Sequence, residues 1–149
     1  MALALCVVAG GPLGCSIRRP PLIALTGVTV AESTAEATAL RFHLELVNPN
    51  PEPLRLREFR YTLLVDGTPV YRGRRAAEAT LSAGGTRQMA IPAVLASTAI
   101  GTAVELRYTL IGSLEYLSPG ELAEILFDTG VQRTRVSFQE SGLIRISAP

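Results

Sequence analysis

The residues that could carry out chemistry in this chain are few. His43 is the only histidine, and the two cysteines, Cys6 and Cys15, both lie in the first fifteen residues. A Ser-His-Asp triad would therefore depend wholly on His43, and the chain after Cys15 has no thiol for a Cys-His pair. His43 lies between Phe42 and Leu44, on the polar side of an alternating segment, so a solvated histidine is the simpler interpretation.

Paired carboxylates are the remaining route to catalysis. Glu121 and Glu124 are three residues apart in a segment predicted to be helical, and such a pair is ordinarily a solvated helix face. No glycine-rich phosphate loop leads from a strand into a helix, and Gly84-Gly85 is interpreted as a hairpin turn. We therefore predict no catalytic residue, no cofactor and no metal site, and hence a protein that is not an enzyme.

The N-terminal segment has the pattern of an export signal. Residues 1–14 carry no charge and run from apolar to small residues, over a length too short to span a bilayer as a helix. Leu13-Gly14-Cys15-Ser16 resembles a bacterial lipobox, which implies cleavage before Cys15 and a lipid on its thiol. Pro12 and the lack of a preceding basic residue depart from that pattern. The alternative is an ordinary signal or a buried first strand with incidental cysteines.

The expected organisation is a signal peptide over 1–14, a lipidated cysteine and tether over 15–21, and one domain over 22–149. More than one acyl chain would anchor the domain stably in a membrane. Arg18-Arg19-Pro20-Pro21 is expected to act as a short, stiff tether. Ser16 after the cysteine favours outer-membrane sorting by resemblance to enteric lipoproteins, so the predicted location is the periplasmic side of the outer membrane in a bacterial cell envelope.

Composition and charge limit the classes of partner that the protein is expected to bind. With 48% hydrophobic residues the chain can form a core without disulfides or metals. Its 14 basic residues are all arginine; residues 51–90 have seven against four acidic residues, a net +3, whereas residues 91–130 have one against five, a net −4. Arginines without interleaved aromatic side chains are more typical of a solvated face, so we predict no nucleic-acid partner.

Beyond Pro21 the dominant hydrophobic period is two, the period of a half-buried strand. The pattern is clearest over 40–46 and returns over 59–65, after which Asp66-Gly67 predicts a tight turn into Val70-Tyr71. Further strands are expected at about 23–33, 86–92, 103–111, 133–138 and 142–147. Many short strands at this spacing predict an all-β antiparallel sandwich or barrel.

One segment has the signature of a short helix. Ser118 and Glu121 form a capping box, Pro119 occupies the first helical position and Gly130 can close the helix. A second helical turn fits residues 92–100.

The run Asn48-Pro49-Asn50-Pro51 is the most distinctive in the chain. Each proline disfavours a helical conformation in the residue before it, and each asparagine can bond to its own backbone, which predicts a bent connector at a strand end. Together with Tyr61 and the Asp66-Gly67 turn, the run resembles the WHy domain of the LEA type 2 family, the water-stress and hypersensitive-response proteins. The resemblance covers residues 22 to 147, and residues 136–142 resemble the closing strand pair of that family.

This resemblance implies an immunoglobulin- or fibronectin III-like antiparallel β-sandwich with one short helix. It also implies a link to desiccation and water stress through protection of other proteins, and it supplies no catalytic residues. Asn48, Pro49, Asn50 and Pro51 are expected to shape the strand exit rather than to bind a ligand.

Three functions without catalysis remain open at this point. The first is a stress-protective module that is anchored in the envelope and binds client proteins through edge strands and sheet faces. The second is an adaptor or assembly subunit of an envelope complex, in which the sandwich is a spacer that binds one partner. The third is a carrier for a small apolar ligand between the sheets.

Overall fold

The strands bury every second side chain, as the period of two predicts. The computed structural model describes residues 18–100, 105–117, 128–130 and 134–146. Within them Leu40, Phe42 and Leu44 are fully buried, and the intervening Arg41 is exposed. A strand with this pattern needs a second apolar layer to cover its buried face.

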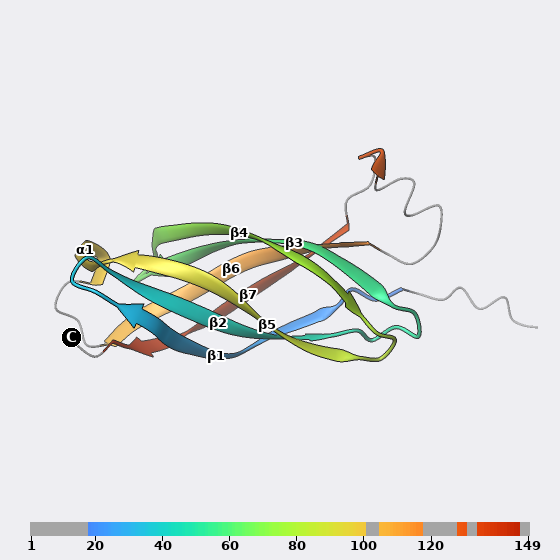
Figure 1. Ribbon diagram of the computed structural model, residues 1–149, viewed down its shortest axis with the longest axis horizontal. Helices are drawn as coiled ribbons and strands as arrows, with labels where there is room; N and C mark the ends of the chain where they lie inside the picture. The colour runs from blue at the N-terminus through green and yellow to red at the C-terminus, as the bar shows by residue number, and fades with distance from the viewer. Residues whose placement is uncertain (1–17, 101–104, 118–127, 131–133, 147–149) are drawn as a thin grey trace, which may run out of the picture.

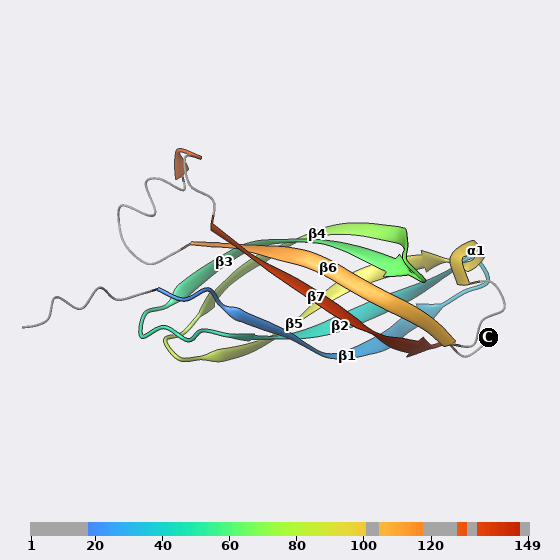
Figure 2. The same ribbon diagram turned by 180° about the vertical axis from the view of Figure 1, so that it is seen from behind.

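Seven strands among the described residues form two antiparallel sheets (Figures 1 and 2). The three-stranded sheet has the order β1-β2-β5 and the four-stranded sheet the order β4-β3-β6-β7. The strands are β1 (Leu22–Ser33), β2 (Ala37–Val47), β3 (Leu54–Val65), β4 (Thr68–Leu81), β5 (Thr86–Ala96), β6 (Glu105–Leu117) and β7 (Thr134–Arg145), and a short helix, α1 (Ser97–Ile100), follows β5. The predicted immunoglobulin- or fibronectin III-like sandwich is confirmed, and the described strands do not close into a barrel.

The core lies between the inward faces of the two sheets. Leucine and phenylalanine side chains of β2 and β3 supply most of its fully buried volume, with Ile91 and Leu95 from β5 and Leu110 from β6. Phe42 of β2 meets Tyr108 of β6 edge to face across the sandwich, with ring centroids 5.5 Å apart. Each large apolar side chain buried in this way contributes about 1.5–3 kcal/mol.

The predicted Asp66-Gly67 hairpin is confirmed. Val65 pairs with Thr68, and the two turn residues have φ angles of 48° and 83°. Two consecutive positive φ angles are those of a type I′ turn, whose twist matches the flanking strands. The Asp66 amide also donates to the Arg107 carbonyl at 3.0 Å, which joins the turn to β6.

Two local predictions are wrong. Residues 133–138 and 142–147 do not form a pair of strands, because β7 continues unbroken through Gly142, which pairs with Tyr108. Gly84-Gly85 is not a hairpin turn, because it carries the chain from β4 in one sheet to β5 in the other. The second helical turn predicted near residues 92–100 is confirmed as α1, which is shorter than that range. Pro92 lies within β5, an edge strand, where a missing N–H is tolerated.

The helix expected between Ser118 and Gly130 lies largely outside the described residues, which include only 128–130 of it.

Glycines make room for aromatic rings inside the four-stranded sheet. Three cross-strand pairs have this form, namely Gly73 with Tyr61, Gly112 with Phe138 and Gly142 with Tyr108. A Cβ on these glycines would lie 2.4, 2.5 and 2.7 Å from the facing aromatic side chain. Glycine within a strand is here a packing requirement rather than a turn signal.

We expect Gly112→Ala to lower the free energy of unfolding by about 1–3 kcal/mol, because the new methyl group overpacks the core. It would lie 2.5 Å from the Phe138 ring and 3.0 Å from the Arg60 carbonyl oxygen. Gly27→Ala is the matched control, since no atom lies within 4 Å of its added Cβ. Urea unfolding measures both variants, and equal losses would contradict this account of the glycines.

Candidate functional site

The Asn48–Pro51 run lies where the chain crosses between the sheets. β2 ends at Val47 and β3 begins at Leu54, so residues 48–53 connect the two layers, and residues 82–85 make the return crossing. The two crossings are joined by backbone hydrogen bonds, from the Asn48 amide to the Gly85 carbonyl at 2.9 Å and from the Gly84 amide to the Asn50 carbonyl at 3.0 Å. Both crossings are therefore held together at one end of the sandwich.

The Asn48 side chain lies at the centre of this junction and is fully buried. Its Nδ2 donates to the Glu52 carbonyl at 2.8 Å and to the Ser82 carbonyl at 2.9 Å. Its Oδ1 accepts from the amide nitrogen and from the Nδ2 of Asn50, both at 3.0 Å. Both ends of the amide are used, as burial of a polar group requires.

Asn50 extends the junction to the chain before β1. Its side-chain amide accepts from the Arg19 amide nitrogen and donates to the Arg19 carbonyl, both at 2.8 Å. Arg18 forms an ion pair with Glu52 at 3.6 Å, and Pro21 is buried. Residues 18–21, which the sequence assigned to a tether, are thus bonded to the domain in this structure.

Tyr61 joins the two sheets in the middle of the sandwich. Its ring lies against Gly73, and its hydroxyl donates to the Pro92 carbonyl of β5 at 2.5 Å. Burial raises the pKa of Tyr61 to about 12, so the phenol stays protonated and keeps this hydrogen bond at neutral pH. Its contacts are structural, and Asp66 and Gly67 form the β3–β4 turn described above.

The candidate catalytic groups do not assemble into a site among the described residues. His43 lies in β2 on the outer face of the three-stranded sheet, where its Nε2 is 3.0 Å from the Thr29 hydroxyl. Over residues 18–100, 105–117, 128–130 and 134–146, no three His, Cys, Asp or Glu side chains gather as a metal site needs. Cys6, Cys15, Glu121 and Glu124 lie outside those ranges.

No helix in the described part of the chain combines the length and the apolar character that crossing a membrane requires.

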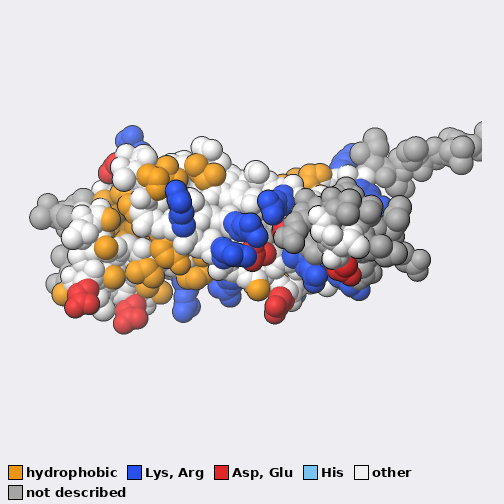
Figure 3. Space-filling view, turned by 90° about the horizontal axis from the view of Figure 1, so that it is seen from above, with side chains coloured by type: hydrophobic (Ala, Val, Ile, Leu, Met, Phe, Trp, Pro, Cys, Tyr) orange, Lys and Arg blue, Asp and Glu red, His pale blue; other side chains and the backbone are white. Residues whose placement is uncertain are grey.

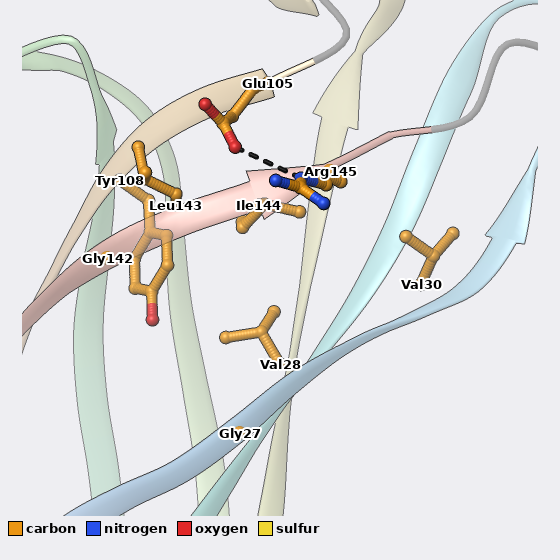
Figure 4. A pocket seen from close by; sticks show the side chains of 9 residues that line it. All are labelled: Gly27, Val28, Val30, Glu105, Tyr108, Gly142, Leu143, Ile144 and Arg145. Atoms are coloured by element: carbon orange, nitrogen blue, oxygen red, sulfur yellow. Dashed lines mark hydrogen bonds and ion pairs between the residues drawn. The ribbon is translucent and has the colours of Figure 1, made fainter.

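The strongest candidate for a binding site is the open side of the sandwich between β1 and β7 (Figure 4). A hollow of about 710 Å³ lies there, with Val28 and Val30 on β1 and Leu143 and Ile144 on β7. The Tyr108 side chain of β6 points into the gap towards β1, and burial raises the pKa of its phenol. On the opposite side of the sandwich β4 and β5 contact each other more extensively.

Two valines show that this side is incompletely covered. Val28 and Val30 pair with Phe42 and Leu40, two fully buried residues, and therefore face the interior. Nevertheless, Val30 remains 41% exposed and Val28 is only half-buried. Leu143 adds an apolar side chain that is 60% exposed at the rim.

The chemistry of this hollow suits binding. Among the described strands, β1 and β7 each pair with a neighbour on one side only, so the other edge of each offers backbone N–H and C=O groups to an added strand. The charged residues at the rim, Glu105 and Arg145, form an ion pair with each other at 3.2 Å. The hollow therefore presents apolar side chains and backbone hydrogen-bonding groups.

These residues could not be identified from the sequence, because it does not show which strands form the edges of the sheets. One signal was available. Leu143 occupies a position of β7 that faces away from the core, opposite Arg107, and it is apolar where its neighbours on that face are polar.

Comparison with known proteins places this arrangement in a family. The family model LEA_2, described as late embryogenesis abundant protein, matches residues 43–142. A protein of Arabidopsis thaliana whose structure was determined in solution shares 13% identity with a TM-score of 0.64, over 93% of this chain and 92% of that chain. A comparison with curated proteins found no match.

Two further solved structures share the fold at low identity. One, described as a late embryogenesis abundant (LEA) protein, is 15% identical with a TM-score of 0.65, over 85% of this chain and 71% of that chain. The other, from Archaeoglobus fulgidus, is 12% identical with a TM-score of 0.55, over 85% of this chain and 100% of that chain.

We expect Asn48→Ala to lower the free energy of unfolding by about 3 kcal/mol, because the Glu52 and Ser82 carbonyl groups and the buried Asn50 amide would lose their partner. Asn48→Asp should cost at least as much, since a carboxylate would then face two carbonyl oxygens. Gln88→Ala is the control, because its bond to Glu45 is exposed. Thermal and urea unfolding measure all three, and an Asn48→Ala variant as stable as Gln88→Ala would contradict the structural role.

Proposed function

Because the chain belongs to the late embryogenesis abundant family LEA_2, we propose that it is a stress-protective binding module that holds segments of other proteins without catalysing a reaction. Membership of this generally non-enzymatic family suggests a role related to water stress. The finer proposal, that the protein binds unfolding clients, comes from the open side of the sandwich between β1 and β7.

The observation that carries the proposal is the incomplete cover of this side. Loss of water exposes apolar segments and backbone groups of other proteins, and both need partners. Val30 and Leu143 offer apolar surface that is already exposed in the folded chain, and the edges of β1 and β7 offer hydrogen bonds that do not depend on the client sequence. A site of this kind suits many clients with modest affinity.

We further propose that the protein is held at a membrane by a lipid on Cys15, in the bacterial envelope on the periplasmic side of the outer membrane. The support for this anchor is the apolar segment over residues 1–14 and the run Leu13-Gly14-Cys15-Ser16. An anchored module would act on proteins near that surface.

For the client-binding proposal, we expect Leu143→Asp to reduce the ability of the full chain to suppress aggregation of a model enzyme during drying and rehydration. A carboxylate at the rim would repel apolar segments from the hollow. Wild-type protein should protect better than an equal mass of albumin, and the variant should lose at least half of that advantage. Light scattering after rehydration and the recovered enzyme activity are the two measurements.

Val94→Asp is the matched control, because Val94 is 45% exposed on the outer face of β5, away from the hollow. It makes the same change of charge and should protect as well as wild type. Equal losses in the two variants, or no advantage of wild type over albumin, would refute binding at the open side.

For the anchor, we expect mass spectrometry of the protein from a bacterial membrane fraction to show a chain that begins at Cys15 and carries acyl groups. Cys15→Ser should abolish the modification, whereas Cys6→Ser should leave it unchanged, because only Cys15 follows the lipobox-like residues. An intact Met1 terminus in the membrane fraction would contradict the anchor.

A further inference from the structure

The outer face of the four-stranded sheet carries an excess of arginine. At positions that pair regularly with a neighbouring strand, this face presents seven arginines and three glutamates, a net charge of +4. The residues are Arg55, Arg60, Arg72, Arg74, Arg107, Arg135, Arg145, Glu58, Glu105 and Glu115. The outer face of the three-stranded sheet presents Arg41 against Glu32 and Glu45, a net −1. The two broad faces of the sandwich therefore differ in sign.

The three glutamates are already engaged by arginines of the same face. Glu58 accepts from Arg60 at 2.6 Å and from Arg74 at 2.9 Å. Glu115 pairs with Arg135 at 3.1 Å, in addition to the Glu105–Arg145 pair described above. Seven guanidinium groups therefore face three carboxylates, and this face keeps a net positive charge.

This charge is concentrated around a shallow hollow of about 480 Å³ over β4, β3 and β6. Arg60 and Arg74 stand directly opposite each other, and Arg72 stands opposite Thr62. Thr62 and Ser113 are short and form the floor between the longer arginine side chains. In Figure 3, which looks onto β3 and β4 from above, arginine side chains gather around carboxylates in the middle of the molecule.

The arrangement of charges around this hollow favours a bound anion. Like charges directly opposite in a ladder destabilise a sheet, and the single carboxylate of Glu58 is shared between Arg60 and Arg74. Arg72 makes no hydrogen bond or ion pair with any residue that the structure describes. Three guanidinium groups, which bind phosphate in a bidentate manner, thus border one open hollow.

We propose that this face, centred on Arg60, Arg72 and Arg74, binds the phosphate groups of an anionic phospholipid surface. The hollow is open and lies on a broad face of one sign, a shape that fits an extended charged surface better than an enclosed small anion. Ile111, 41% exposed beside the arginines, adds an apolar side chain at the same level.

The same face is poorly suited to nucleic acid. Single-stranded nucleic acid needs aromatic side chains on which bases stack. In the described part of this sheet, Phe59, Tyr61 and Tyr108 are buried towards the core. Phosphate groups presented by a lipid surface need no stacking partner.

Binding through this face fixes an orientation. The four-stranded sheet would face the lipid and the three-stranded sheet would face water (Figures 1 and 2). Leu143 lies on the lipid-facing side of β7, whereas Val28 and Val30 face the interior of the sandwich. The contact is centred on Arg60, Arg72 and Arg74, and their hollow shares no lining residue with the hollow between β1 and β7.

The test is co-sedimentation of the full chain with vesicles of phosphatidylcholine alone and with vesicles of phosphatidylcholine and phosphatidylglycerol in equal parts. We expect binding to rise with phosphatidylglycerol and to weaken with salt. Arg72→Gln combined with Arg74→Gln should reduce the phosphatidylglycerol-dependent binding by about thirtyfold, the effect of losing two arginines near an anionic surface. Any contribution of residues 1–17 is common to all variants.

Arg41→Gln combined with Arg87→Gln is the matched control, since it removes two arginines from the three-stranded sheet and lowers net charge equally. It should retain binding, and unfolding curves should show both double variants folded. Equal losses in the two double variants, or binding that ignores phosphatidylglycerol, would overturn the proposal. Displacement of the vesicles by millimolar inorganic phosphate at constant ionic strength would also overturn it. So would binding to DNA that is tighter than binding to vesicles and that is lost when Arg72 and Arg74 are changed.

Discussion

The buried amide of Asn48 is the interaction on which the arrangement of the two sheets depends. The chain leaves one sheet after β2, returns after β4, and both crossings pass the same side chain. Because Asn48 donates to one crossing through Glu52 and to the other through Ser82, neither can move without leaving buried polar groups unpaired. Asn50 adds the segment before β1 to the same network.

The contacts that join the two sheets differ from one part of the sandwich to another. At the crossing end the layers are joined by a saturated polar network, and in the middle by the Tyr61 hydroxyl on the Pro92 carbonyl. On the β1–β7 side no comparable bond is found among the described residues, and the inward-facing Val30 remains partly exposed. A rigid closed end and an open apolar side together form a scaffold that can present a binding surface without unfolding.

The arginine-bordered hollow and the apolar hollow lie at different places on the molecule. Arg60, Arg72 and Arg74 border the first, over β4, β3 and β6, whereas Val30 and Leu143 line the second, between β1 and β7. Pairing of Glu58 with Arg60 and Arg74 lowers the pKa of that carboxyl group, so Glu58 stays charged between the two arginines at mildly acid pH. A contact centred on these arginines and a contact at the hollow between β1 and β7 use different residues.

Local patterns were sufficient for the strands, the Asp66-Gly67 turn and the sandwich class, because alternation and turn chemistry act over a few residues. They placed a break in β7 between residues 138 and 142 and a hairpin turn at Gly84-Gly85, since a glycine in a crossing between sheets looks the same in sequence as one in a hairpin turn. Strand order and the packing of the two sheets decided the open side, because Val30 and Leu143 lie on β1 and β7, strands that are far apart in the sequence. Arg60, Arg72 and Arg74 are brought together by the β3–β4 hairpin, and only the pairing of β6 with β3 adds Ile111 and Ser113 to their hollow. Long-range pairing is a property of the whole chain, and no local spacing encodes it.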